Sequence, residues 1–379
     1  MSAHSILASM GDEGRMQVRS LTMTSLDIPF RQAFTHASAA RSKTEAVLVR
    51  AESVRGLVGM GEGCPRHYVT GETVAGAQEF FRSHRSEWMT CSTVDDLQAW
   101  GTAHADLIDR NPAAWCAVET ACLDLLGKEM EQPIEVVLGC TPLSGPFQYS
   151  AVLGGEKFFS FERQLRQYLA VGFSDFKLKV MGDLEADRER VAALTAAGIP
   201  GLRVRLDANN RWHRVDEACE YIQGLNGTFT ALEEPLRVGD YEGCRILSRR
   251  CGVPIILDES FVSVGQFPVI EAEPSLWIVN IRVSKMGGLL RACAVAAQAK
   301  SLGIPIVVGA QVGETSILTR AALTVADRYR DVMTAQEGAF GTHLLEYDLC
   351  DPPLMFGRGG RLAVDGCYNR PGLGLSFVR

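Results

Sequence analysis

The sequence has no apolar run long enough to cross a membrane. None of its hydrophobic stretches approaches the roughly 20 residues that a spanning helix needs. Residues 1–14 also lack the basic start and apolar core that mark a secretory signal, and we expect them to be a disordered terminus. The sequence therefore predicts a cytoplasmic protein with no membrane partner.

The cysteines do not follow the pattern of a metal site or of a disulfide framework. There are eleven of them, an odd number, and no two are spaced as Cys-x-x-Cys. Because their neighbours are mostly apolar, they are typical of buried thiols in a reducing compartment. This pattern favours a cytosolic protein over a disulfide-rich or zinc-binding one.

An excess of positive charge is also missing. The chain has 38 basic and 45 acidic residues, which gives a formal net charge of −7. A mildly acidic surface argues against non-specific binding to nucleic acid or to anionic membranes. With 46% hydrophobic and 22% charged residues over 379 positions, the composition is that of a globular protein large enough for a barrel and a smaller domain.

The first third of the chain is predicted to be an α+β capping domain over residues 15–140. It begins with alternating strand patterns, including a hairpin over 44–62, and continues with helical spacing over 73–138. Two polar segments, 30–42 and 63–71, are predicted to be loops. Both carry distinctive basic and aromatic side chains, although most loops of this kind only cap a domain.

The pattern changes after a predicted linker at residues 139–145. From 146 to 350, short apolar runs alternate with amphipathic helices, which is typical of parallel βαβ units. A seventh strand is predicted at 305–309 and an eighth at 343–349. The Gly- and Pro-rich tail, 351–379, is expected to pack back on the capping domain.

Five of the apolar runs end in a charged residue at nearly constant spacing. Lys179, Asp207, Glu233, Asp258 and Lys285 follow one another at intervals of 28, 26, 25 and 27 residues, which fits one strand, one helix and two loops. In a closed βα barrel the strand C-termini meet at one face. We therefore expect three carboxylates around one point, with an ammonium group on either side.

The three acids predict a magnesium site. Asp207, Glu233 and Asp258 offer oxygen ligands only, which suits Mg²⁺, whereas zinc normally recruits His or Cys. Any one of these acids alone is more simply explained as a helix cap or a solvated residue. All three at matching register favour the metal site.

The lysines predict proton transfer. Lys177 and Lys179 share one face of a strand, so two inward ammonium groups are expected to lower each other's pKa, as a general base requires. Lys285 is expected across the barrel, where it would serve the other face of a substrate. The implied reaction is removal of a proton next to a carboxylate, with Mg²⁺ stabilising the enediolate that forms.

Five motifs together resemble those of the enolase superfamily, in its muconate-lactonizing-enzyme subgroup. They are Lys-x-Lys, Asp-x-Asn, Glu-Glu-Pro, Asp-Glu-Ser and Lys-x-Gly-Gly, in this order and spacing, and the resemblance covers nearly the whole chain. It implies a (β/α)7β barrel of the TIM type, with an N-terminal α+β cap completed by the C-terminal tail. It also implies a small-molecule carboxylate substrate, a homo-oligomer, and cap loops that close over the substrate and select it.

The resemblance also implies roles for individual residues. Mg²⁺, or Mn²⁺ in its place, would be held by the three acids. Lys179 would be the base, Lys177 an accessory lysine that helps to hold the carboxylate, and Lys285 the opposing acid or base. The residues that we expect to bind substrate are Glu314, Gln311, Asn209, Asp348 and His36. For Glu314, capping of the next helix is an equally good interpretation.

Two departures from the family narrow the reaction. No histidine lies near the seventh strand, where the mandelate-racemase subgroup has a base. Dipeptide epimerases carry Asp-x-Asp at the eighth strand to hold the substrate ammonium, whereas this chain has Asp348-Leu349-Cys350 at the position predicted for it. The second acid is therefore missing, which argues against that activity.

Two opposed lysines favour racemisation or epimerisation of an amino-acid-derived acid. The first alternative is a syn-dehydratase or a cycloisomerase, such as a lactonizing or o-succinylbenzoate synthase-like enzyme, which needs the same metal but only one essential lysine. The second is a metal-binding or assembly protein without turnover. The presence of all three acids and all three lysines argues against this last alternative.

Overall fold

The computed structural model describes residues 15–36, 39–155, 158–363 and 369–378, without the side chains of 33–36 and 39–40. The chain begins with an antiparallel sheet in the order β1, β4, β5, as the predicted hairpin requires. These strands are Val18–Leu26 (β1), Ala46–Ser53 (β4) and Val58–Gly63 (β5).

Helix α6 (Pro112–Glu129) packs closely on this sheet because the facing strand presents only glycines. The helix is buried along its length up to Gly127. On β5, a Cβ atom added at Gly59, Gly61 or Gly63 would come within 2.1 Å of a main-chain oxygen of the helix. Any side chain at these positions would therefore push the helix off the sheet.

The rest of the cap is helical, as predicted, but the predicted loop at 30–42 is wrong. This segment is a β-hairpin of β2 (Pro29–His36) and β3 (Ala39–Lys43), which lies apart from the three-stranded sheet of the cap. Most of its described side chains are exposed, and they show no alternation of buried and exposed positions that would reveal a strand. The cap helices are His67–Thr70 (α2), Val74–Trp88 (α3), Val94–Ala103 (α4), Ala105–Arg110 (α5) and Ile134–Val137 (α7).

Eight parallel strands then form a curled sheet in chain order, from β7 to β14. The main-chain nitrogen of Ser150, just before β7, donates a hydrogen bond of 2.8 Å to the oxygen of Gln336 in β14, so the first and last strands meet. The strands are Ala151–Leu153 (β7), Asp175–Lys179 (β8), Arg203–Asp207 (β9), Ala231–Glu233 (β10), Ile255–Leu257 (β11), Trp277–Ile281 (β12), Ile306–Val308 (β13) and Met333–Gln336 (β14).

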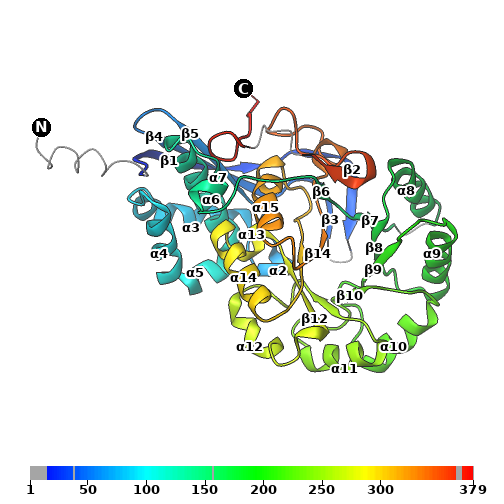
Figure 1. Cartoon of the computed structure of the whole chain (residues 1–379). Coiled ribbons are helices and arrows are strands. Elements are labelled where there is room, and N and C mark those ends of the chain that lie inside the picture. Colours follow the sequence, from blue (N-terminus) through cyan, green and yellow to red (C-terminus); the bar gives the residue numbers. More distant parts are fainter. Residues whose placement is uncertain (1–14, 37–38, 156–157, 364–368, 379) are drawn as a thin grey trace, which may run out of the picture.

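Helices follow the strands and cover the outside of the barrel (Figure 1). With seven helical connections between eight strands, the architecture is the expected (β/α)7β barrel. The helices are Phe158–Val171 (α8), Leu184–Ala196 (α9), Val215–Gly224 (α10), Tyr241–Cys251 (α11), Phe267–Ile270 (α12), Val283–Met286 (α13), Leu289–Ser301 (α14) and Ser316–Arg328 (α15).

The position predicted for the eighth strand is wrong. The eighth strand is β14, whereas the predicted segment 343–349 contributes only an isolated antiparallel bridge between Leu345 and Phe30 of the cap. The true strand is four residues long and half of it is polar, so its signal is weaker than that of the leucine-rich segment ten residues later. This error displaces the residues that are expected at the strand end.

The C-terminal tail returns to the cap. The main-chain nitrogen of Gly372 donates to the oxygen of Gln132, and that of Leu373 donates to Asp124 in α6 at 2.7 Å. In Figure 1 the red end of the chain accordingly lies beside α6 and α7. These contacts support our proposed division of the chain into a cap (15–140), a barrel (146–350) and a returning tail.

No helix in the described ranges is long and apolar enough to span a bilayer. The described cysteines are all free thiols, and most of them are buried.

A buried ion pair links the cap to the barrel, and its contribution to stability can be tested. Glu135 in α7 accepts two hydrogen bonds from Arg320 in α15, at 2.8 and 2.9 Å, and a third from Thr324. Glu135→Gln should lower the free energy of unfolding by about 3–5 kcal/mol, because it leaves a buried guanidinium without its counter-charge. Urea denaturation measures this change. Glu162→Gln, in an exposed pair, should change it by less than about 1 kcal/mol, and equal effects would contradict the prediction.

Candidate active site

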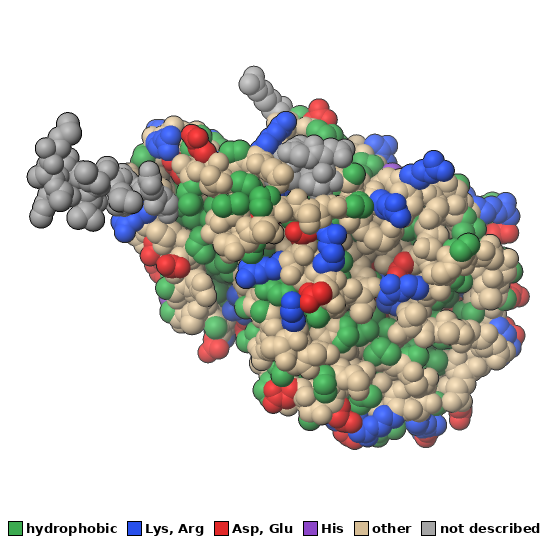
Figure 2. Space-filling view, in the orientation of Figure 1, with side chains coloured by type: hydrophobic (Ala, Val, Ile, Leu, Met, Phe, Trp, Pro, Cys, Tyr) green, Lys and Arg blue, Asp and Glu red, His purple; other side chains and the backbone are tan. Residues whose placement is uncertain are grey.

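A cavity of about 870 Å³ opens at the carboxyl ends of the barrel strands. Its floor is formed by strand-end residues of the barrel, and its roof includes Arg31 and Gln32 of the β2–β3 hairpin and Tyr68 of α2. The space-filling view shows a hollow on this face with acidic and basic side chains beside it (Figure 2). Both cap segments that were expected to cover a substrate therefore contribute to the roof.

The three predicted acids lie on three neighbouring strands. Asp207 and Glu233 are the last residues of β9 and β10 and are paired in register, and Asp258 directly follows β11. All three are almost completely buried. Parallel strands in register bring residues with matching positions to one edge, which is how the regular sequence spacing becomes a cluster.

Lys177 lies among these acids. Its Nζ atom is 3.1 Å from both carboxylate oxygens of Glu233, 2.8 Å from Glu337 and 3.6 Å from Asp207. Burial alone would lower the pKa of Lys177, but the negative charges of Glu233, Glu337 and Asp207 outweigh it and raise this pKa. The expected depression of the pKa by the neighbouring lysine is therefore wrong for Lys177.

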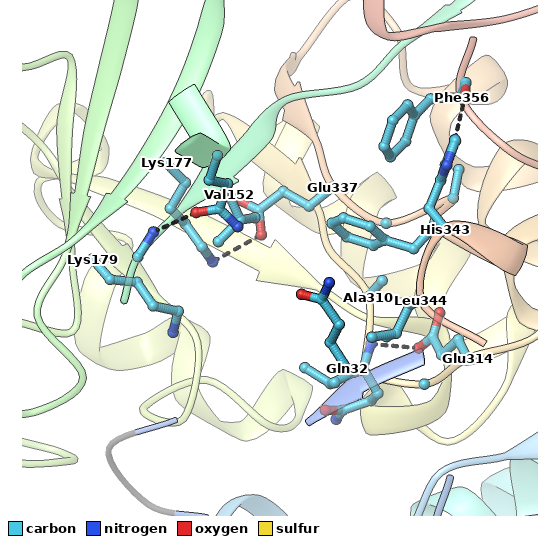
Figure 3. Close-up of a pocket in the computed structure, with 18 of the residues that line it drawn as sticks. Gln32, Val152, Lys177, Lys179, Ala310, Glu314, Glu337, His343, Leu344 and Phe356 are labelled. Atoms are coloured by element: carbon cyan, nitrogen blue, oxygen red, sulfur yellow. Dashed lines mark hydrogen bonds and ion pairs between the residues drawn. The ribbon is translucent and has the colours of Figure 1, made fainter. Parts of the chain in front are cut away.

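Lys179 lies nearer the open cavity. Its Nζ atom donates to Asn209 at 3.1 Å and to Asp207 at 3.3 Å, and both Lys179 and Asn209 line the cavity. In Figure 3 the two lysines extend from one side of the pocket, and Glu314 and His343 lie on the other side. Lys177 lines the cavity as well, but its side chain is 5% exposed and that of Lys179 is 13% exposed, so Lys179 is the more accessible of the two.

Glu337 is a site residue that the sequence did not predict. This residue follows β14, accepts from Lys177 at 2.8 Å and from Arg205 at 3.1 Å, and lines the cavity. Its strand was placed ten residues too late, so its position at a strand end was hidden. The sequence signal that could have revealed Glu337 is the four-residue strand just before it, which continues the barrel's strand–helix alternation.

The structure does not bring Lys285 to the cavity. Lys285 lies in α13, four residues beyond β12, and its Nζ atom donates to the main-chain oxygens of Asp258 (2.7 Å) and Asn280 (2.8 Å) and to the Asp258 carboxylate (2.9 Å). It is wholly buried, and burial, reinforced by the charge of Arg282, lowers its pKa. The expected placement of Lys285 as a group facing the substrate is therefore corrected.

Arg282 takes the place expected for that lysine. It is the first residue after β12, it lines the cavity, and its guanidinium contacts the carboxylate of Asp258 and donates to Gln311 at 2.9 Å. Its side chain is 11% exposed. The short Arg-x-x-Lys sequence offers two basic residues, and only the end of the strand decides which of them faces inward.

The other predicted binding residues divide into three groups. Asn209, Gln311 and Glu314 line the cavity. Asp348 is not among the described lining residues, because its carboxylate accepts from the main-chain nitrogens of Ser316 and Cys350 and so caps α15. Its expected site role came from the misplaced eighth strand. The side chain of His36 lies outside the part of the chain that the structure describes.

Glu314 is not the cap of the helix that follows it. Its carboxylate accepts from the main-chain nitrogen of Gln311 at 2.6 Å, whereas the N-cap of α15 is Thr315, whose hydroxyl accepts from Ile317. Burial raises the pKa of Glu314 to about 8, so the carboxyl group is largely protonated at neutral pH. It is placed to donate a hydrogen bond into the cavity.

The donor set fits a hard divalent cation in its chemistry. Three buried carboxylates offer oxygen ligands, and each is in contact with a basic side chain: Lys177 contacts Asp207 and Glu233, and Arg282 contacts Asp258. Among the described residues, no three metal-ligating side chains lie close enough together to hold an ion as they stand. Holding one would require these basic groups to give up their contacts with the acids.

The fold and the cavity define a capped α/β-barrel protein with a carboxylate and lysine centre at the strand ends. The family model described as Enolase C-terminal domain-like matches residues 160–379, and the chain belongs to this family. It is an enzyme of the enolase superfamily in the muconate-lactonizing-enzyme-like subgroup. A structure of muconate lactonizing enzyme from Pseudomonas fluorescens superimposes with a TM-score of 0.85 at 22% identity, covering 96% of this chain and 97% of that chain.

Curated relatives are isomerases. A hydrophobic dipeptide epimerase of Enterococcus faecalis is 26% identical over 343 residues, 86% of this chain and 92% of the relative. Dipeptide epimerase from that organism, complexed with Mg and L-Leu-L-Tyr, has a TM-score of 0.82 and 25% identity over 95% of this chain and 100% of that chain. An N-succinyl-L-Arg/Lys racemase of Bacillus cereus is 23% identical over 82% of this chain and 84% of the relative.

The raised pKa of Glu314 predicts a stability effect of pH. The folded protein binds this proton more tightly than the unfolded chain, so the stabilisation is full below the ordinary pKa of 4.5 and is lost as pH rises through about 8. Relative to Glu314→Gln, the wild type should therefore lose unfolding free energy between about pH 5 and pH 8. Urea titrations at several pH values measure the difference. The exposed Glu189→Gln is the matched control, and a flat difference for Glu314 would contradict the prediction.

Proposed function

We propose that this enzyme removes the proton α to the carboxylate of an amino-acid-derived acid, with Mg²⁺ as its metal. The observation that carries the proposal is one cavity lined by Lys179 and Asp207, with Glu233 and Asp258 buried at the neighbouring strand ends. The relatives support both the metal and the substrate class, since one of them was solved with Mg and a dipeptide.

Asp207, Glu233 and Asp258 are the proposed holders of Mg²⁺, and we expect Mn²⁺ to serve in its place. When bound, the ion supplies positive charge that stabilises the enediolate as it develops. With these acids holding the ion, Lys177 and Arg282 would give up their carboxylate contacts. Both side chains would then be available to the negative charge of a substrate.

Lys179 is the proposed base. It lines the cavity at the end of β8, and its hydrogen bond to Asn209 orients the Nζ atom. Lys177, one pleat deeper, is held by Glu337 and Glu233 and is the proposed carboxylate-binding cation. Glu314, protonated at neutral pH, is the proposed hydrogen-bond donor to a substrate oxygen, with Gln311 beside it.

Inversion at the α carbon is the first candidate outcome. The relatives named above are an epimerase of dipeptides and a racemase of N-succinyl amino acids, and these names favour a racemase or epimerase reaction. The eighth strand ends in Gln336-Glu337-Gly338, and the single acid is held by Lys177 and Arg205. This arrangement favours a substrate without a free ammonium group at that strand, such as an N-acylated amino acid.

A one-base reaction is the second candidate outcome, and Arg282 favours it. A syn-dehydratase or a cycloisomerase needs a base on one face only. In this chain the cavity residue at the end of β12, across the barrel from Lys179, is an arginine. Elimination of water or closure of a ring would follow from the same enediolate.

Proton exchange tests the proposed function. In D₂O with Mg²⁺, the enzyme should introduce deuterium at the α carbon of a compound in a set of N-acyl amino acids and dipeptides, followed by NMR. Lys179→Ala should slow this exchange by about 10²- to 10⁴-fold, because general-base catalysis contributes that much. A chelator should abolish the exchange, and added Mg²⁺ should restore it.

The control for this experiment is Lys300→Ala, which removes a surface lysine on α14 that pairs with Asp331. This variant should exchange at the wild-type rate. Equal exchange by wild type and Lys179→Ala, or exchange that survives complete removal of the metal, would contradict the proposal. The products separate the two outcomes, because inversion conserves the formula of the substrate and dehydration does not.

A further inference from the structure

We propose that Arg282 is a fixed positive charge that holds the substrate's negative charge on the face opposite Lys179, and that, among the lysines in the described ranges, Lys179 is the one that moves the α proton. The inference rests on the proposed α-proton abstraction and decides between its two outcomes. It replaces the pair of opposed lysines with one base and one guanidinium.

The register of the barrel places Arg282 opposite the base. β8 and β12 are four strands apart in an eight-stranded barrel, so their ends face each other across the mouth. Lys179 is the last residue of β8, and Arg282 follows the last residue of β12, as Asp258 follows β11 and Glu337 follows β14. Of these residues, Lys179, Arg282 and Glu337 line the cavity.

Lys285 cannot reach a substrate from its present position. Its Nζ atom already donates three hydrogen bonds, two of them to main-chain oxygens, and none of its side chain is exposed. An ammonium group has three donors, so the group is saturated. Lys285 holds Asp258 in place and joins α13 to the ends of β11 and β12.

Arg282 has N–H donors that its present contacts do not use. Its Nη1 atom is anchored by Gln311 at 2.9 Å, its Nη2 atom contacts Asp258, and its buried Nε has no partner among the described residues. A guanidinium stays charged at any pH at which proteins fold, and its planar fork matches a carboxylate. It can therefore bind negative charge but cannot exchange a proton with carbon.

The chemistry then runs on one face. Neutral Lys179 accepts the α proton, the C–H bond breaks, and its electron pair moves into the carboxylate to give the enediolate, whose added charge Arg282 holds. The proton returns to the same face of the carbon with retention of configuration. Alternatively, Lys179 gives the proton to a hydroxyl on the β carbon, which leaves as water with the C–O electron pair while the Cα–Cβ double bond forms.

The test compares the two configurations at the α carbon separately. With Mg²⁺ in D₂O, the wild type should exchange the α proton of one configuration at least about 100-fold faster than that of the other, because only one face has a base. Arg282→Lys should raise exchange of the slow configuration by about tenfold or more, since an amine can transfer protons. Arg291→Lys, a matched change on α14 outside the cavity, should change neither rate.

Two results would overturn the inference: interconversion of both configurations by the wild type, or an unchanged slow configuration in Arg282→Lys. Absence of exchange for every compound, with wild type and Lys179→Ala alike, would instead refute the proposed function itself.

A separate binding measurement tests the role of Arg282 without the substrate.

Acetohydroxamate resembles an enediolate and can be titrated by calorimetry into the Mg²⁺-loaded protein. Arg282→Met should weaken its binding about tenfold or more, because a charge-assisted contact is lost, whereas Arg291→Met should bind it like the wild type. Thermal unfolding confirms that the variants fold. Equal affinity in folded Arg282→Met would overturn the charge-holding role.

Discussion

The structure depends on a concentration of negative charge that has to be buried at the mouth of the barrel. Asp207, Glu233 and Glu337 converge on Lys177, and each is almost completely removed from water. Buried carboxylates repel one another strongly at low dielectric, so the site is stable only with cations placed among them. Lys177 and Arg205 supply positive charge among these acids, and burial, reinforced by Asp207 and Glu337 and opposed by Lys177, raises the pKa of Glu233. A site of this kind favours a divalent cation, and it also favours the extra positive charge that a carboxylate substrate requires.

Buried carboxylates also attach the cap to the barrel, but there they accept hydrogen bonds from the first turns of helices. Glu62 of β5 accepts from the main-chain nitrogens of Thr315 and Leu318 at the start of α15, and Glu119 of α6 accepts from those of Leu289 and Leu290 at the start of α14. The first turn of a helix has free N–H donors and partial positive charge, which these buried acids satisfy. Burial raises the pKa of Glu62 to about 7 and that of Glu119 to about 8. The cap is therefore held to the barrel by directional bonds, and Arg31 of the roof is held separately, by hydrogen bonds to the main-chain oxygens of Leu344 and Leu345.

Much of the fold was predictable because the strand–helix period is regular wherever the strands are long or strongly apolar. Asp207, Glu233 and Asp258 were located by that period, and so was Lys179. The prediction of the eighth strand failed because Met333–Gln336 is short and half polar. Since the strand was expected ten residues later, Glu337 was missed and Asp348 was assigned to the site. The prediction for the β2–β3 hairpin failed because the hairpin lies outside both larger sheets and its described side chains show no buried stripe. Both failures occur where tertiary contacts, and not local pattern, stabilise the element.

The error at Lys285 has a different physical origin. The charged strand ends recur every 25–28 residues; Lys285 follows Asp258 by 27 residues and Arg282 follows it by 24, so the interval favoured the residue that does not face the cavity. Spacing measured in residues cannot separate positions that differ by three, whereas the end of β12 at Ile281 does so at once. Beyond that strand the chain turns into α13, and three residues of helix carry the next basic side chain behind Asp258, away from the cavity. Two basic residues so close together therefore have opposite environments: one is saturated by main-chain oxygens, and the other keeps an N–H without a described partner. Because a guanidinium and an amine differ in whether they can release a proton, this three-residue difference decides whether the site has one base or two.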